Sequence, residues 1–108
     1  MVRQRFSAAH YLKGYKGKCE AIHGHNYVVE VWLKKNQLNQ IGLVYDFTAF
    51  KNQIRKILPD HKLLNSIFTF NPTAENLAKY FYEKLRKRYP VAKVVVWESD
   101  DSAAEYEA

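Results

Sequence analysis

The chain has 108 residues, of which 47% are hydrophobic and 15% aromatic, and a formal net charge of +6. This length fits one domain over residues 1–108, and the composition is that of a globular protein rather than a disordered one. No stretch reaches the about 18 consecutive apolar residues of a membrane-spanning helix, and no apolar run follows the basic N-terminus, so we expect neither a membrane segment nor a signal peptide. A single cysteine, Cys19, excludes an internal disulfide and suits a reducing compartment, which predicts a cytoplasmic protein.

The charge is distributed unevenly along the chain. Residues 98–108 hold five acidic side chains and no lysine or arginine, so the other 97 residues carry 17 basic and 6 acidic side chains, a net charge of +11. Such a body attracts anions, whether nucleic acid, membrane headgroups or a phosphorylated metabolite. Charge alone does not choose among them, and a solvated lysine-rich surface explains many of these lysines equally well.

The first half of the chain shows the two-residue period of strands. Residues 2–10 and 23–35 alternate between two faces, which predicts a strand in each segment. Glycines mark residues 11–18 as the loop between them, and residues 36–42 are polar and turn-like. Residues 43–46 can return as a strand and form a hairpin.

Helical spacing then replaces this alternation. Apolar residues recur every three to four positions over residues 47–58, and Pro59 ends the helix. The segment Asn71-Pro72-Thr73 is a start signal for a second helix, with its first or last residue as the N-cap. This helix ends near residues 89–90.

Two further strands are predicted after the helices, a valine-rich strand over residues 91–99 and a short one over residues 103–106. The order strand, strand, helix, helix, strand, strand predicts an α+β fold. In this fold two helices cover one face of a four-stranded antiparallel sheet. The other face then needs water or another subunit.

Three histidines are placed to form a metal site. His23 and His25 are separated by one residue on a strand, so their imidazoles leave the same face. His10 ends the first strand on the face of its apolar residues and can supply a third ligand. Because neutral imidazole is a good zinc ligand, this phasing favours a metal site over three unrelated surface or core histidines.

Cys19 leaves two kinds of zinc site open. As a fourth ligand it would close a structural site, whereas beside an open zinc ion it would serve as a nucleophile or base. A lone cysteine is most often a small buried apolar residue, but the Gly/Lys-rich loop around Cys19 argues against that interpretation. Asp60 and His61 follow Pro59, and on their own they indicate a turn with a surface histidine more than a proton-transfer pair.

Several motifs run in order over nearly the whole chain: Phe6–His10, Cys19–His25, Val44–Phe47, Asp60–Asn65, Asn71–Asn76, Glu98-Ser99 and Tyr106. Together they resemble the 6-pyruvoyl-tetrahydropterin synthase family. Its prokaryotic branch includes the 6-carboxy-tetrahydropterin synthases of the deazaguanine (queuosine-type) pathway. The resemblance reverses the interpretation of Asp60 and His61, which become a functional pair.

The resemblance implies the tunnelling fold, in which subunits pool their antiparallel sheets into a barrel, usually as a hexamer of two trimers, with active sites at subunit interfaces. It also implies the site residues. These are the Zn²⁺ ligands His10, His23 and His25, the catalytic residues Cys19, Asp60 and His61, and the pterin-binding residues Glu98 and Thr73.

The implied reaction converts 7,8-dihydroneopterin triphosphate to 6-carboxy-5,6,7,8-tetrahydropterin, with release of triphosphate and acetaldehyde. The same motifs also allow the 6-pyruvoyl product, and Glu20 beside Cys19 leaves room for the aldolase-like cleavage of relatives that carry glutamate in place of the cysteine. The most distant alternative is a non-enzymatic, zinc-stabilised module that binds nucleic acid, which the acidic tail disfavours. We therefore expect neither a nucleic-acid nor a membrane partner, and the sequence assigns no particular lysine or arginine to the triphosphate.

Overall fold

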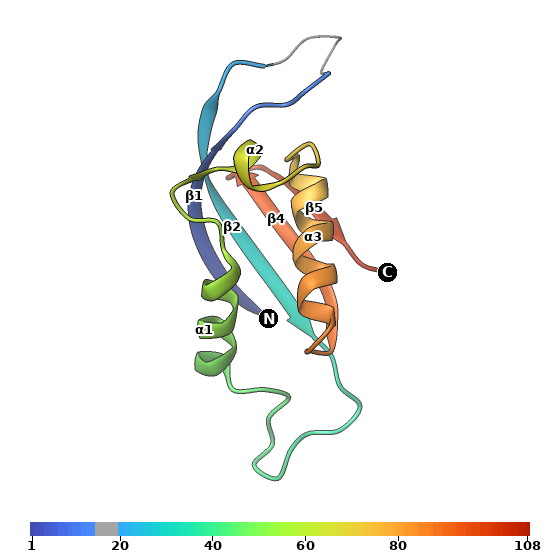
Figure 1. Cartoon of the computed structure of the whole chain (residues 1–108). Coiled ribbons are helices and arrows are strands. Elements are labelled where there is room, and N and C mark those ends of the chain that lie inside the picture. The colour runs from blue at the N-terminus through green and yellow to red at the C-terminus, as the bar shows by residue number, and fades with distance from the viewer. Residues whose placement is uncertain (15–19) are drawn as a thin grey trace.

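One curved sheet forms a layer of the molecule, and helices pack against one of its faces (Figure 1). The structure is a computed structural model that describes residues 1–14 and 20–108. Its elements are β1 (Val2–His10), β2 (His23–Leu33), α1 (Phe47–Ile57), β3 (Lys62–Leu63), α2 (Leu64–Ile67), α3 (Ala74–Arg86), β4 (Val91–Ser99) and β5 (Ser102–Tyr106). The strand order is β3-β1-β2-β4-β5, and all neighbours are antiparallel except β1 and β3. The predicted α+β class is confirmed, but the sheet has five strands instead of the predicted four and is mixed instead of purely antiparallel, because β3 pairs in parallel with β1.

The β1–β2 ladder determines which side chains meet at the core. The two strands pair from Val2 opposite Val31 to His10 opposite His23. On the helix-covered face Phe6 stacks on Tyr27, with 4.8 Å between ring centroids. The side chains of Phe6, Tyr27, Val2 and Val31 are all buried. Burying a side chain of this size contributes about 1.5–3 kcal/mol, so the ladder and the core stabilise each other.

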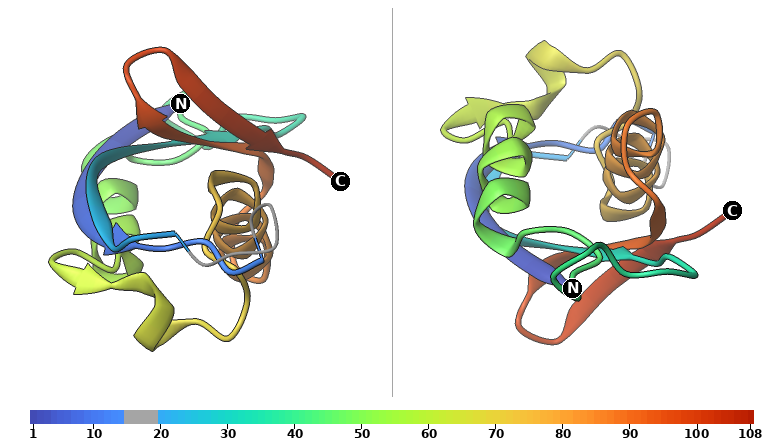
Figure 2. Two further views of the ribbon diagram at one scale, coloured as in Figure 1. Left: turned by 90° about the horizontal axis from the view of Figure 1, so that it is seen from above. Right: turned by 90° about the horizontal axis from the view of Figure 1, so that it is seen from below.

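Both long helices lie on the concave side of the sheet (Figure 2). α1 begins after Asp46, whose carboxylate accepts a hydrogen bond from the Ala49 N–H, and it ends just before Leu58-Pro59. α3 begins after Thr73, whose hydroxyl accepts a hydrogen bond from the Asn76 N–H. Thr73, rather than Asn71, is therefore the N-cap of the second predicted helix. No helix in the described ranges is long and apolar enough to cross a membrane.

The structure corrects several details of the sequence prediction. Residues 43–46 do not form a strand, because Leu43 bonds to Asn39 within a local turn instead of pairing with β2. β3 and α2 were not predicted, since elements of two and four residues are too short to show a period. α3 ends at Arg86, short of residues 89–90, and β2 ends at Leu33 rather than at residue 35. The oligomeric barrel stays a prediction.

Candidate metal centre

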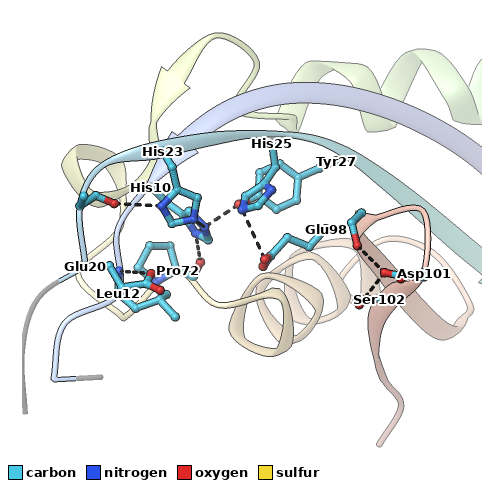
Figure 3. A network of polar contacts seen from close by, with 12 residues as sticks. His10, Leu12, Glu20, His23, His25, Tyr27, Pro72, Glu98, Asp101 and Ser102 are labelled. Atoms are coloured by element: carbon cyan, nitrogen blue, oxygen red, sulfur yellow. Dashed lines mark hydrogen bonds and ion pairs between the residues drawn. The ribbon is translucent and has the colours of Figure 1, made fainter. Parts of the chain in front are cut away.

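Three histidines meet at one end of the sheet, where β1 ends and β2 begins (Figure 3). The ladder sets His10 opposite His23 and Ala8 opposite His25, and the pleat points the three imidazoles to the same face. One ring nitrogen of each histidine lies within 4.8 Å of the others, and the ring centroids are 4.7 to 5.0 Å apart. The structure thus brings the three histidines together as a group that can hold a metal ion.

Backbone carbonyls fix the tautomers of two of these rings. The carbonyl of Pro72 lies 2.8 Å from Nδ1 of His10, and the carbonyl of Ala21 lies 2.9 Å from Nδ1 of His23. A carbonyl oxygen only accepts, so each Nδ1 carries the proton and donates it. Each neutral ring then has its lone pair at Nε2, the arrangement found in metal-binding histidines that donate their other N–H to an acceptor.

The two Nε2 atoms of His10 and His23 lie 3.1 Å apart. With both Nδ1 atoms protonated, two lone pairs face each other across this distance, which is unfavourable unless a cation or an extra proton lies between them. A tetrahedral zinc ion with Zn–N bonds of about 2.0–2.1 Å separates its ligand nitrogens by about 3.3–3.4 Å. The spacing in the protein therefore fits two ligands of one ion.

His25 supplies the third nitrogen. Its Nε2 is buried and has no hydrogen-bond partner among the described residues. Glu98 Oε1 lies 3.3 Å away, at ion-pair distance but outside hydrogen-bond geometry. Burial lowers the pKa of His25, and the opposing effect of Glu98 does not offset it. A neutral ring with a buried, unpartnered nitrogen beside two lone pairs is what a metal ion would satisfy.

The two residues predicted to bind the pterin are at the same end of the molecule. Glu98, near the end of β4, points its carboxylate toward His25 (Figure 3), and its side chain is 35% exposed. The hydroxyl of Thr73 caps α3 at 3.0 Å from the Asn76 nitrogen, next to the Pro72 carbonyl that contacts His10.

Asp60 and His61 lie at the outer edge of β1 instead. Asp60 accepts a hydrogen bond from the Ser7 N–H at 2.8 Å, and the His61 N–H donates to the Ser7 carbonyl at 2.6 Å. The two side chains are 3.5 Å apart and largely exposed, and His61 lines an open hollow with Ser7, Asn26 and one member of the histidine cluster, His25. The side chain of Ser7 leaves the sheet on the opposite face from His10. Among the described residues, no hydrogen bond or ion pair joins this pair to the three histidines.

Cys19, predicted as the catalytic base, lies outside the described residues. Its neighbour Glu20 is described, and its carboxylate accepts a hydrogen bond from the Leu12 N–H at 3.2 Å while its own N–H donates to the Leu12 carbonyl at 3.0 Å. Glu20 therefore ties the segment after β1 to the segment before β2.

Sequence reasoning missed the groups that orient the histidines. The carbonyls of Pro72 and Ala21 are backbone atoms, which carry no signal in a sequence. Tyr27 could have been found, because it follows His23 and His25 on the same face of the strand. Its buried hydroxyl lies 3.2 Å from Nδ1 of His10, and burial raises its pKa.

Comparisons with known proteins place the chain in a family. The family model described as 6-pyruvoyl tetrahydropterin synthase matches residues 1–108. The 6-carboxy-5,6,7,8-tetrahydropterin synthase of Aquifex aeolicus is 33% identical over 122 residues, which cover 82% of this chain and 75% of that protein. The dihydroneopterin monophosphate aldolase of Pyrococcus furiosus is 32% identical over 111 residues, which cover 97% of this chain and 93% of that protein.

A solved structure agrees with this placement. The 6-pyruvoyl tetrahydropterin synthase of Caenorhabditis elegans matches with a TM-score of 0.83 at 28% identity, covering 99% of this chain and 92% of that one. These findings confirm the resemblance and favour an enzyme over a non-enzymatic zinc module. The chain belongs to the 6-pyruvoyl tetrahydropterin synthase family and is an enzyme of the lyase class.

Proposed function

We propose that the protein holds a zinc ion through His10, His23 and His25 and converts 7,8-dihydroneopterin triphosphate and water to 6-carboxy-5,6,7,8-tetrahydropterin, triphosphate and acetaldehyde. One observation carries the proposal. The Nε2 atoms of His10 and His23 face each other while the ring protons are on Nδ1, and Nε2 of His25 is buried with no hydrogen-bond partner among the described residues. The name of the Aquifex aeolicus relative supports this product.

Zinc bound at this site would polarise the side-chain oxygens of the substrate and stabilise the negative charge that develops there. The remaining chemistry is proton transfer by the protein. Cys19, as a thiolate, removes a proton from the substrate side chain, and His61 returns one. The Asp60 carboxylate lies 3.5 Å from Nε2 of His61 and would orient the ring for this transfer.

The position of Asp60 and His61 suggests that they serve the site of a neighbouring copy. His61 is 83% exposed at the sheet edge, yet its backbone is in the left-handed region, with a φ of 57°, and is held there by Ser7. For a residue other than glycine this conformation is uncommon and is found at functional sites more than elsewhere. We therefore propose that subunits pool their sheets into a barrel, as a hexamer of two trimers in the cytoplasm, with active sites at the interfaces.

Two residues would hold the pterin beside the zinc ion. The carboxylate of Glu98 can accept two N–H bonds from the amino-pyrimidinone edge, a bidentate and charge-assisted contact. The hydroxyl of Thr73 would bind from the start of α3. The basic body of the chain, with its net charge of +11 over residues 1–97, attracts the triphosphate.

The test is to incubate zinc-loaded protein with dihydroneopterin triphosphate and to weigh every product. A carboxy pterin with acetaldehyde and triphosphate is the expected result. A pyruvoyl pterin with triphosphate alone would assign the 6-pyruvoyl activity instead. A hydroxymethyl pterin with a phosphorylated two-carbon fragment would assign aldolase activity, as in the Pyrococcus furiosus relative's name. No turnover by zinc-loaded protein would contradict the proposal.

Cys19→Ala separates the open zinc site from a closed one. If Cys19 is the base, the variant keeps one zinc ion per chain and loses turnover. Loss of the zinc ion would instead make Cys19 a fourth ligand and the site structural.

A further inference from the structure

Two asparagine side chains hold the backbone just before the Pro72 carbonyl, which accepts the His10 N–H. The amide of Asn71 pairs with the backbone of Lys13, accepting from its N–H at 2.9 Å and donating to its carbonyl at 3.2 Å. The amide of Asn76, in the first turn of α3, donates to the Asn71 carbonyl at 2.9 Å. The Thr73 N–H donates to the same carbonyl at 2.8 Å.

These bonds determine where the Pro72 carbonyl points. The Asn71 carbonyl and the Pro72 nitrogen belong to one peptide plane, so a bond that fixes the first fixes the second. The proline ring sets φ of Pro72, and Thr73 is fixed in turn as the N-cap of α3. Pro72 is fully buried, so water does not replace the protein as a partner.

The direction of the Pro72 carbonyl is important because a second group competes for Nδ1 of His10. The Tyr27 hydroxyl lies 3.2 Å from the same Nδ1 of His10, only 0.4 Å farther than the Pro72 carbonyl at 2.8 Å. The carbonyl can only accept, so it keeps the proton on Nδ1 and the lone pair on Nε2. A hydroxyl can also donate, and a donor at Nδ1 would move the ring proton to Nε2, the nitrogen that faces His23.

We propose that Asn76 and Asn71 are positioning residues of the metal centre. They aim the Pro72 carbonyl at His10 and so select the tautomer whose Nε2 can bind a metal ion, against the tautomer that Tyr27 would select. The inference rests on the proposed function in one respect, that the ion is held through His10.

The variant that tests it is Asn76→Ala, because the Asn76 side chain donates to the Asn71 carbonyl and, in the described part of the chain, forms no hydrogen bond to the histidines or to Lys13. Zinc affinity, measured by competition with a chromophoric chelator, is expected to fall by about 10–100-fold, as for other groups that orient a metal ligand. The matched control is Asn39→Ala. Asn39 organises the loop at the opposite end of the molecule by accepting two backbone N–H bonds, from Ile41 and Leu43, and its loss should leave zinc affinity unchanged.

A double variant separates tautomer control from a general loss of structure. Tyr27→Phe removes the competing hydroxyl, so Asn76→Ala/Tyr27→Phe should recover most of the zinc affinity that Asn76→Ala loses. Nitrogen-15 NMR of the histidine rings in the metal-free protein should show His10 protonated at Nδ1 in the wild type and shifted toward Nε2 in Asn76→Ala. Where Asn76→Ala does not fold, Asn76→Ser removes the same donor, and the same outcomes apply.

Equal zinc affinity in wild type and Asn76→Ala, an equal loss in Asn39→Ala, or no recovery in the double variant would overturn the proposal. A wild-type protein that binds no zinc would contradict the proposed function instead. The NMR comparison then still decides the network, since it needs no metal: an unchanged His10 tautomer in Asn76→Ala would refute it.

Discussion

The three histidines and the Asp60–His61 pair differ in how far one chain organises them. His10 is 1% exposed and His25 has a buried nitrogen, whereas the side chain of His61 is 83% exposed. The three histidines lie on two long paired strands, and carbonyls set the tautomers of His10 and His23. The Asp60–His61 pair lies beside a two-residue strand at the sheet edge. This contrast supports our proposal that one chain holds the metal centre and that the Asp60–His61 pair serves the site of a neighbouring copy.

The largest effect is expected at the metal centre itself. His23→Ala removes a ligand nitrogen, so zinc affinity should fall by more than the about 10–100-fold typical of groups that only orient a ligand. His23 is partly exposed, so the metal-free protein should unfold at nearly the wild-type temperature. Chelator competition and thermal unfolding measure the two quantities. Zinc binding at wild-type strength would remove His23 from the centre.

The second-largest effect is expected at the Asp60–His61 pair and should not extend to the three histidines. His61→Ala should lower kcat by about 10²–10⁴-fold, the usual loss when a general acid or base is removed, and leave zinc affinity and stability unchanged. Lys62→Ala, which changes the exposed neighbour, is the control and should keep full activity. A weaker zinc affinity in His61→Ala would show that the pair belongs to the metal centre, contrary to the comparison.

Glu98 is intermediate between the buried histidines and the exposed Asp60–His61 pair, because its carboxylate is close to His25 but its side chain is 35% exposed. Glu98→Gln should weaken substrate binding by about 1.5–3 kcal/mol, the worth of a hydrogen bond to a charged group. Calorimetric titration with a non-reactive pterin measures the change. Asp101→Asn alters a carboxylate bonded only to Ser99 and Ser102 among the described contacts, and it should bind as the wild type does. Equal affinities for all three proteins would remove Glu98 from the pterin site.

The smallest effect is expected at Thr73. Thr73→Ala removes the hydroxyl that caps α3 and should lower the free energy of unfolding by about 0.5–2 kcal/mol. Thr73→Ser keeps the cap and should keep the stability. Urea unfolding of both variants makes the comparison, and a destabilised Thr73→Ser would show that the methyl group rather than the cap is responsible.

Much of the scaffold was predictable because its signals are local. The bounds of β1 follow from alternation, those of β4 follow from its run of valines, and the start of α3 follows from Asn71-Pro72-Thr73. The failures are segments whose state depends on distant contacts. Residues 43–46 have the sequence pattern of a strand, but the Asn39 side chain accepts a hydrogen bond from the Leu43 N–H and holds the segment in a turn. The two residues of β3 are in a strand because they pair with the edge of β1, a contact between segments far apart in the sequence.

The site divides in the same way. The pleat places His23 and His25 on one face, so periodicity alone predicted two ligands and the phase of His10. The Pro72 and Ala21 carbonyls could not be predicted, because any residue supplies a carbonyl and only the tertiary fold directs it to a ring. Asp60 and His61 were assigned by resemblance, and their place at the edge of β1 follows from backbone bonds to Ser7 that no pattern reveals.

Mixing two inactive variants tests the central claim most directly. His23→Ala lacks a metal ligand but keeps His61, and His61→Ala keeps the metal centre but lacks the pair. If the pair acts on the cluster of a neighbouring copy, subunits unfolded and reassembled together at equal amounts should recover about a quarter of the wild-type activity per site, because random assembly of a symmetric oligomer joins an intact cluster to an intact pair in that share of sites. Recovery at that level, from variants that are inactive alone, is the predicted result. A mixture as inactive as its two components would contradict the account and place the cluster and the pair of each site in the same chain.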